Sequence, residues 1–241
     1  MKDWVAFYDS AHSIYVNARH RDVHYARLAE EIARYVPSRS GAVLDYGCGE
    51  AIHADRLAAA AGRLTLAEAA QSVRARLIER FKSNPRITVI STDRAAVLPE
   101  GSLDLVVMHS VSQYLTRDAF DSTAALFYRL LKPGGVLLVG DVVRPDVSAA
   151  SDAWALLGFG LREGFFLAAL YGLVRTFFSE YWRLRTRLGL TRYGEAEMIT
   201  ELAAVGFAAE RAPRNLGHLQ TRMTFLGRKA TVEPQQGRAA N

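Results

Sequence analysis

The chain has 241 residues, of which half are hydrophobic and 23% are charged, so it can bury the core of one large domain. This composition excludes a disordered chain. The single cysteine, Cys48, excludes a disulfide scaffold and a cysteine metal cluster, and it favours a reducing compartment. The net charge of +5 belongs to the C-terminal third, because residues 161–241 carry 12 basic and 7 acidic side chains.

The sequence contains no pattern typical of a secreted, membrane-spanning or nucleic-acid-binding protein. The N-terminal residues have no apolar run typical of a secretory signal, and we expect a cytoplasmic protein. Charged residues interrupt the most apolar stretch, 153–178, so its charge-free runs are shorter than the roughly 20 residues that span a bilayer. The basic third has no dense basic block, and we expect no nucleic-acid partner.

The apolar spacing predicts helices over residues 3–16 and 23–36, followed by a break at Pro37 and Gly41. Strands and helices then alternate, which is typical of an α/β fold with a parallel, doubly wound sheet. We expect strands at 42–46, 64–67, 87–91, 103–108 and 136–139, and helices at 51–61, 71–81 and 118–131, the last one stopped by the sequence KPGG at 132–135.

After residue 141 the pattern changes. Residues 148–189 predict a long helical segment, residues 196–204 a further helix, and residues 207–211 and 222–228 a pair of strands. The predicted organisation is an N-terminal helical cover at 1–36, a sheet domain at 37–147 and 190–230, a helical lid insertion at 148–189, and a disordered tail at 231–241.

The segment VLDYGCGEA at residues 43–51 joins a strand to a helix through a glycine turn. Gly47 and Gly49 have no Cβ, so the backbone can approach a ligand closely, and N–H groups at the following helix start can bind it. Glu68 ends the next strand 23 residues after Asp45, where an acid can hold the two hydroxyls of a ribose.

Further segments accompany this turn. They are STDRA at 91–95, LPEGSLDLVV at 98–107, LKPGGVL at 131–137 and Gly206-Phe207. Together with DYGCG at 45–49 and Glu68, they resemble the class I S-adenosylmethionine-dependent methyltransferases over about residues 38–143 and 194–229. The resemblance implies a Rossmann-like, seven-stranded, mostly parallel sheet of order 3-2-1-4-5-7-6, with S-adenosylmethionine as cofactor. Ala51 departs from the family, many members of which have a third glycine there.

The resemblance also implies roles for residues of the glycine turn. The Asp45 side chain and the Gly47 backbone would lie by the methionine end of the cofactor. Tyr46, Cys48 and Gly49 complete the predicted cofactor contacts of this turn. The position of Cys48 inside the turn favours a small filler side chain over a nucleophile.

Four positions outside the turn complete the implied site. Glu68 would hold the ribose hydroxyls, with Ala69 packing near the adenine. Asp93 would accept a hydrogen bond from the adenine amino group, and Arg94 would contribute a backbone N–H beside it. His109, directly after the fourth strand, would lie near the sulfonium. Simple strand capping or a surface turn would explain the acids without a ligand.

The N-terminal segment is rich in acid–base side chains. We expect it to fold over the cofactor cleft, with Tyr15 close to the methionine end and His12 or His20 facing the acceptor. His109 or one of these histidines is the candidate base for an acceptor hydroxyl or acidic carbon. Ordinary packing on the sheet is the alternative. His20 and His24 have a metal-ligand spacing without a third ligand on that face, so no metal is predicted.

Residues 148–189 are the most aromatic part of the chain. They would line a hydrophobic acceptor pocket, with Phe165 and Phe166 contributing to acceptor affinity, or form a hairpin that packs on the sheet or on a second subunit. Arg183, Arg185 and Arg187 follow and could contact an anionic acceptor or a membrane surface, or form a solvated helix end.

We interpret the chain as a methyltransferase that acts on oxygen or carbon of a small, apolar or amphipathic acceptor. A dinucleotide enzyme is disfavoured because Ile52 occupies the position of its third glycine, and Asp45 would repel a pyrophosphate. Two alternatives stay open. One is a non-catalytic binding or scaffold protein with the methyltransferase fold, and the other is an RNA methyltransferase that uses the basic C-terminal third.

Overall fold

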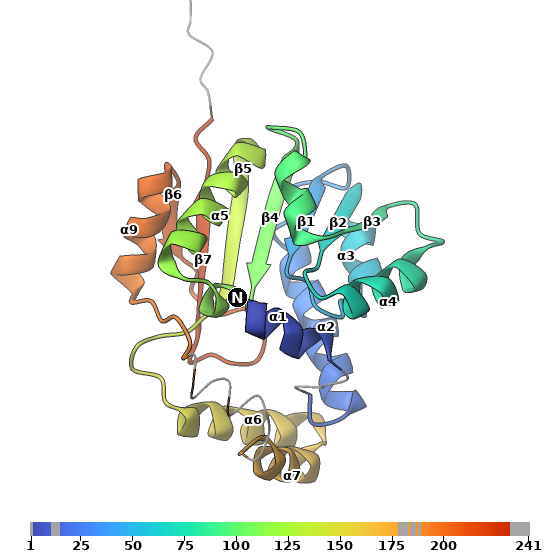
Figure 1. Ribbon diagram of the computed structural model, residues 1–241, viewed down its shortest axis with the longest axis vertical. Helices are drawn as coiled ribbons and strands as arrows, with labels where there is room; N and C mark the ends of the chain where they lie inside the picture. Colours follow the sequence, from blue (N-terminus) through green and yellow to red (C-terminus); the bar gives the residue numbers. More distant parts are fainter. Residues whose placement is uncertain (1, 11–14, 178–182, 184–186, 188, 232–241) are drawn as a thin grey trace, which may run out of the picture.

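The computed structural model describes residues 2–10, 15–177, 183, 187 and 189–231, and it is built around one seven-stranded sheet (Figure 1). The strands are β1 (Ala42–Tyr46), β2 (Arg63–Ala67), β3 (Ile87–Ile90), β4 (Leu103–His109), β5 (Leu131–Val142), β6 (Ala208–Arg211) and β7 (Met223–Arg228). Their order is β3-β2-β1-β4-β5-β7-β6, with β7 antiparallel to both neighbours, which confirms the predicted order.

Helices cover both faces of the sheet because the strand residues alternate between two hydrophobic cores. In β1, Val43 belongs to the core formed with the helices α2 (Ala18–Ala33), α3 (Ala54–Ala60) and α4 (Gln71–Phe81). The next residue, Leu44, belongs to the opposite core, which is formed with the helices α5 (Arg117–Leu130) and α9 (Glu195–Val205).

The order of the strands reverses direction between β1 and β4. In open α/β sheets such a switch point opens a crevice at the carboxyl ends of the strands, where ligands bind. Register pairs Val43 with Leu105 and Asp45 with Val107, so β4 extends past β1 and ends at His109. The functional site is therefore expected at the lower edge of the sheet in Figure 1.

Several predicted element boundaries were wrong by a few residues, each for a local reason. The helix predicted from residue 51 begins at Ala54, because Ala51 has a left-handed φ of 37°. The helix predicted from residue 23 begins at Ala18, because the Asn17 side chain accepts a hydrogen bond from the His20 N–H and caps it. The strand predicted from residue 136 begins at Leu131, which pairs with Leu103 across a register shift.

The N-terminal helix α1 (Lys2–Asp9) ends earlier than predicted and packs with Trp4 and Phe7 buried. The Tyr8 hydroxyl bonds that of Tyr114 at 2.7 Å, in the short 3₁₀ helix η2 (Ser112–Tyr114). At its other end, Asp9 accepts a hydrogen bond from the backbone N–H of Ser72. α1 therefore joins α4 to the segment that follows β4.

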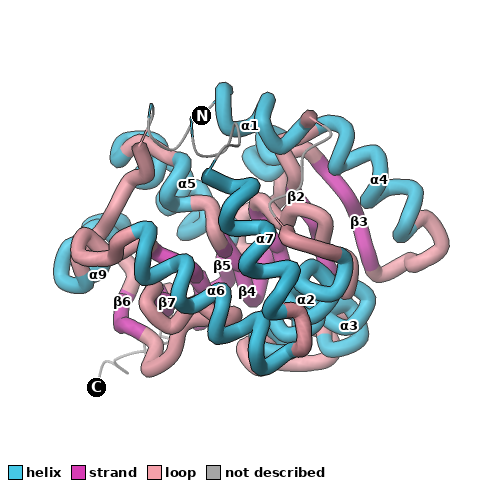
Figure 2. Tube along the Cα trace, turned by 90° about the horizontal axis from the view of Figure 1, so that it is seen from below, coloured by secondary structure: helices cyan, strands magenta, loops and turns pink. Residues whose placement is uncertain are grey.

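The long helical segment predicted at 148–189 begins as two helices, α6 (Ala149–Glu163) and α7 (Phe166–Phe177), which pack on each other. The break lies at Gly164, whose φ of 77° is a left-handed helix cap. Seen from below, this α6–α7 hairpin lies across the carboxyl ends of β4 and β5 (Figure 2). Among the described residues, no helix is both long and apolar enough to cross a membrane.

Candidate active site

The turn after β1 is closely packed against two side chains. Gly47 has a φ of 76° and Gly49 a φ of 58°. A Cβ added at Gly47 would lie 2.4 Å from a methyl carbon of Val111, and one at Gly49 would lie 2.7 Å from the Tyr25 hydroxyl. Both positions therefore require glycine, for the backbone conformation and for space.

Glu68 connects this turn to the end of β2. Its two carboxylate oxygens accept hydrogen bonds from the backbone N–H groups of Gly49, at 2.9 Å, and Ala70, at 2.8 Å. Burial raises the pKa of Glu68, and the hydrogen bonds from Ala70 and Gly49 oppose that effect. Each oxygen retains a lone pair for another donor, so Glu68 can hold the turn and a ligand together.

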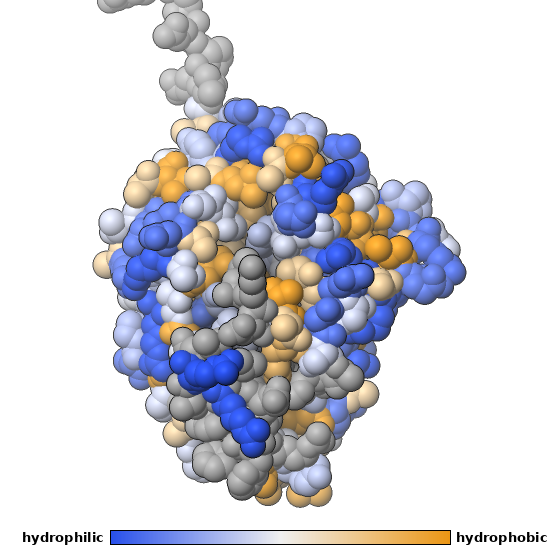
Figure 3. Space-filling view, in the orientation of Figure 1, coloured by the Kyte–Doolittle hydropathy of each residue, from blue (hydrophilic) through white to orange (hydrophobic). Residues whose placement is uncertain are grey.

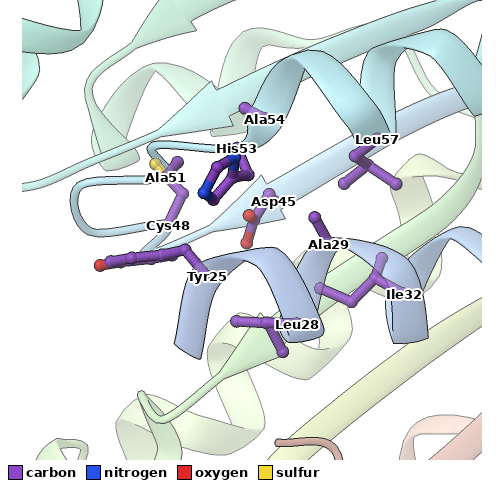
Figure 4. A pocket seen from close by; sticks show the side chains of 10 residues that line it. All are labelled: Tyr25, Leu28, Ala29, Ile32, Asp45, Cys48, Ala51, His53, Ala54 and Leu57. Atoms are coloured by element: carbon purple, nitrogen blue, oxygen red, sulfur yellow. The ribbon is translucent and has the colours of Figure 1, made fainter. Parts of the chain in front are cut away.

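Asp45 lies at the carboxyl end of β1 and faces a narrow cavity between α2 and the start of α3 (Figure 4). The cavity, of about 20 Å³, has room for one water molecule. Burial, with Glu68 as a nearby negative charge, raises the pKa of Asp45 to about 7. A cationic group beside this carboxylate would offset both effects. The cavity is lined by Tyr25, Leu28, Ala29, Ile32, Asp45, Cys48, Ala51, His53, Ala54 and Leu57.

Two residues of the turn pack into opposite cores. The Tyr46 ring contacts Phe127 of α5 at 5.0 Å between centroids, so it points to the far side of the sheet from Asp45. Cys48 is buried, and burial raises the pKa of its thiol well above the ordinary range. A thiol with so high a pKa is a poor nucleophile.

The residues expected on the adenine side lie beyond β3, in the 3₁₀ helix η1 (Thr92–Val97). Asp93 and Arg94 are exposed, and a hydrogen bond from Ser91 lowers the pKa of Asp93. The Arg94 backbone N–H, which was expected beside the adenine, donates to the Ser91 carbonyl at 3.1 Å. Ala69 is half-buried, and its carbonyl accepts from Arg74 at 3.1 Å.

Four histidines meet at the carboxyl end of β4. His109 ends that strand, His20 and His24 come from α2, and His218 comes from the loop between β6 and β7. The His24 ring lies 6.3 Å from His109 and 5.9 Å from His218, and His20 lies 5.7 Å from His218. We call these four residues the histidine cluster.

The α6–α7 hairpin covers the histidine cluster with two phenylalanines. Phe165 stacks on His20 with centroids 5.1 Å apart and planes at 19°. Phe159 stacks on His218 at 4.2 Å and 10°. Phe166, expected to act with Phe165, is 38% exposed and is not part of this contact.

Burial lowers the pKa of every member of the histidine cluster, to about 4 for His20 and about 3 for His218. All four are therefore neutral at pH 7. Three ring nitrogens are buried without a hydrogen-bond partner among the described residues: Nε2 of His20 and Nδ1 of His24 and of His109. Such nitrogens can accept or donate a hydrogen bond to a bound molecule.

Two tyrosines connect the histidine cluster to the glycine turn. The Tyr25 hydroxyl accepts a hydrogen bond from the Glu50 backbone N–H at 2.9 Å, directly after the turn. Tyr15 lies 5.6 Å from Tyr25 and 5.5 Å from His24, measured between ring centroids. Burial raises the pKa of both phenols, so both remain protonated donors.

The backbone beside His109 is strained at two places. His109 of β4 pairs with Gly140 of β5. The residues that follow them, Ser110 and Asp141, both have left-handed φ values, 57° and 60°. The Ser110 hydroxyl donates to the Asp141 carboxylate at 2.6 Å, and Asn215 accepts from the Asp141 N–H. Non-glycine residues in this conformation concentrate at functional sites.

Sequence reasoning overlooked His218 altogether. It lies 109 residues after His109 in a loop with no recognisable motif. Hydrogen bonds fix that loop in place: the Gly217 N–H donates to Glu31 of α2 at 2.6 Å, and Arg222 pairs with Asp152 of α6 at 2.7 Å. Only the three-dimensional fold brings these elements together.

Some predicted residues fall outside the cluster. His12 and Arg185 lie outside the described residues, and Arg183 and Arg187 are exposed. In the part of the chain that the structure describes, no group of three His, Cys, Asp or Glu side chains could hold a metal ion.

Comparisons with known proteins agree with this geometry. Residues 43–135 match the family model described as a methyltransferase domain. The DhpI–SAH complex is 14% identical, with a TM-score of 0.60 over 96% of this chain and 97% of that one. The putative methyltransferase bound to the Trm112 activator of Haloferax volcanii is also 14% identical, with a TM-score of 0.59 over 87% of this chain and 92% of that one.

A third structure, phosphoethanolamine N-methyltransferase 2 from Haemonchus contortus, is 15% identical, with a TM-score of 0.58 over 86% of this chain and 53% of that one. No curated protein matches the chain in sequence. At these identities the solved structures establish the fold, and the family model establishes the domain. Residues 43–135 therefore match a methyltransferase domain, and the seven-stranded sheet has the fold of known S-adenosylmethionine-dependent methyltransferases.

Proposed function

We propose that this methyltransferase acts on an oxygen or an acidic carbon of a small, apolar or amphipathic acceptor. The observation that carries the proposal is the histidine cluster, with Phe159 and Phe165 stacked on it at the carboxyl end of β4. The histidine cluster and the two phenylalanines form a surface that is neutral at pH 7. It consists mostly of aromatic rings, and it has ring nitrogens without a hydrogen-bond partner among the described residues. It suits an uncharged ring or chain that carries one exchangeable proton.

The residues of the glycine turn fit S-adenosylmethionine. Asp45 is a half-buried carboxylate whose pKa is raised by burial and by the nearby charge of Glu68, and the methionine ammonium would offset both effects. Glu68 retains lone pairs for the ribose hydroxyls, and the absence of side chains at Gly47 and Gly49 lets the backbone approach the ligand. Tyr15 would contact the methionine end.

The cofactor supplies an activated methyl group that the acceptor displaces from a sulfonium. The chain itself aligns the acceptor and excludes water from the reacting atoms. When the new O–CH₃ or C–CH₃ bond forms, the acceptor loses one proton. We assign that proton to the unpartnered nitrogen of His24 or His109, with His20 and His218 beside them. The lone cysteine is consistent with a cytoplasmic setting.

The experiment is a methyl-transfer screen with labelled S-adenosylmethionine against metabolite extracts, followed by kinetics on the acceptor found. Phe165→Ala should raise the acceptor KM at least roughly tenfold, because a buried aromatic contact is lost, while cofactor affinity changes little. Phe166→Ala is the matched control, since that neighbouring side chain is 38% exposed whereas Phe165 is buried against His20. Equal effects of the two variants would contradict the proposed acceptor site.

The same preparation distinguishes the two alternatives. A scaffold protein would bind no S-adenosylhomocysteine in calorimetry and methylate nothing. An RNA methyltransferase would bind RNA with an affinity that falls steeply with salt, and would lose that binding when arginines of the C-terminal third are replaced. Either result would replace the small-molecule proposal.

A further inference from the structure

Seven large hydrophobic side chains of the α6–α7 hairpin are exposed. Elsewhere among the described residues only Ile78 and Val97 are comparably exposed. In Figure 3 a few hydrophobic residues are visible at the bottom rim of the molecule, where Figure 1 places α6 and α7. The seven are Trp154, Leu161, Phe166, Leu167, Leu170, Tyr171 and Val174. We call them the outer face of the hairpin.

The outer face follows from the helical period. In α7, Leu167, Leu170 and Val174 recur at three- and four-residue spacing, so they form one stripe on the side away from the sheet. In α6, Trp154 and Leu161 are seven residues apart and lie on one helical face. The opposite side of the hairpin is already occupied, because Phe159, Phe165 and Ala169 form a buried cluster against the histidines.

The segment that contains the outer face is positively charged. Residues 148–189 carry five arginines against three acids, and Arg162 and Arg183 are exposed. One of the acids, Asp152, is paired with Arg222 inside the structure. An exposed apolar stripe with Trp and Leu, flanked by arginines, has the composition of a helix that lies in a membrane interface.

We propose that the outer face of the α6–α7 hairpin docks on an anionic lipid surface and lies within its headgroup region. The arginines favour this occupant over a second copy of the chain, since a two-fold contact would bring like charges of both copies together. Docking would place the lipid directly outside Phe159 and Phe165. The proposal rests on the exposed surface and goes beyond the proposed function by naming where an apolar acceptor enters.

Flotation of the full-length protein with vesicles tests this proposal. Vesicles of phosphatidylcholine mixed equally with phosphatidylglycerol should retain the protein, and pure phosphatidylcholine should retain much less. Raising the salt concentration should weaken the retention, because it screens the arginines. Replacing Leu167 and Val174 together by glutamine should reduce partition roughly tenfold, because both apolar side chains lose their burial in lipid.

The matched control replaces Ile78 and Val97 by glutamine, which removes similar exposed apolar area far from the hairpin and should leave partition unchanged. Arg162→Gln should reduce partition to the anionic vesicles only. The proposal is overturned if the wild-type protein floats with neither vesicle, or if the Leu167/Val174 variant partitions like the wild type. It is also overturned if light scattering shows a dimer that this variant dissociates, because a second copy then covers the face. None of these results depends on the identity of the acceptor.

Discussion

The half-buried side chain of Asp45 ionises less readily in the folded protein than in water. Its pKa of about 7 lies above the ordinary value of 3.8, so between these pH values the folded protein binds more protons than the unfolded chain, and stability falls as pH rises through this window. A bound ammonium would reverse that penalty. Functional sites often contain groups that lower the stability of the free protein and whose unfavourable energy is offset when the ligand binds.

Asp45→Asn should therefore change stability and affinity in opposite directions. At pH 8 the variant should melt at a higher temperature than the wild type in the absence of cofactor, because it has no charge to bury. Its affinity for S-adenosylhomocysteine should fall by roughly 10-fold or more, since a charge-assisted hydrogen bond is lost. Differential scanning fluorimetry and calorimetry measure the two quantities.

The exposed Glu79, paired with Lys82 on the surface of α4, supplies the control: Glu79→Gln should change neither quantity appreciably. An Asp45→Asn protein with unchanged affinity would place the ammonium elsewhere. An Asp45→Asn variant less stable than the wild type at pH 8 would show that Asp45 already has a cationic partner.

His20 predicts a pH dependence of stability with a definite sign. Its pKa of about 4 in the folded state lies below the ordinary histidine value of 6.5, so between these pH values the unfolded chain binds more protons. Its contribution to stability is complete above pH 6.5 and is lost as pH falls through this window, by up to about 1.4 kcal/mol per pH unit.

Urea unfolding of the wild type and of His20→Gln, at several pH values from 7.5 to 4.5, measures this effect. The stability advantage of the wild type over the variant should shrink as pH falls. Asp45, whose raised pKa has the opposite sign, is common to both proteins and cancels in the difference. Parallel curves would mean that His20 is protonated equally in both states, and that the cluster is more hydrated than the structure shows.

At the scale of elements, the sequence predicted the sheet better than the site. The strand order was predictable because the glycine turn, the acid ending the second strand and the KPGG segment occur at characteristic places of one fold. The site was harder to predict, because no local sequence pattern marks His218 or the strained pair of Ser110 and Asp141. Their positions depend on hydrogen bonds between elements far apart in the sequence.

The orientation of side chains in the α6–α7 hairpin was also not predictable from the sequence. The aromatic content predicted an acceptor pocket but did not indicate which side chains face it. Gly164 ends α6 in a left-handed conformation, and the chain reverses there. That reversal turns Phe165 inward onto His20 and leaves Phe166 partly exposed, although the two residues are adjacent and chemically identical.

The N-terminal helix α1 gives the prediction at this scale. Tyr8 of α1 contacts Tyr114 of η2. Val111, the residue directly before η2, packs against Gly47. Deleting residues 2–10 should therefore loosen the glycine turn without removing any strand. We expect the sheet to fold, as judged by circular dichroism, while affinity for S-adenosylhomocysteine and turnover both fall.

Tyr8→Phe is the graded control for this deletion. It removes the Tyr8 hydroxyl, and with it the 2.7 Å hydrogen bond to Tyr114, and should lower stability by about 1 kcal/mol with a small effect on affinity. Full activity in the protein lacking residues 2–10 would show that α1 only packs on the surface. The predicted role of the N-terminal segment as a cover would then have to rest on Tyr15 and α2.

At the scale of the whole molecule, the buried hydrophobic residues that the structure describes form two large cores and one small one. The large cores lie on the two faces of the sheet and contain its central strands. The small core consists of Phe159, Phe165 and Ala169, with a few partly buried neighbours. Segments held by few buried contacts open locally at a lower free energy than the central strands.

The α6–α7 hairpin should therefore exchange its backbone amides much faster than β4 and β5. Hydrogen-exchange mass spectrometry of the free protein tests this expectation. Addition of S-adenosylhomocysteine together with the acceptor should slow exchange in the hairpin and around His218, because a ligand between Phe159, Phe165 and the histidines adds contacts to the small core. S-adenosylhomocysteine alone should mainly protect the glycine turn and the end of β2. Protection of the hairpin by S-adenosylhomocysteine alone would contradict this arrangement and indicate that the cofactor binds beneath α6. Hairpin exchange as slow as that of β4 in the free protein would show that the hairpin is already ordered without an acceptor.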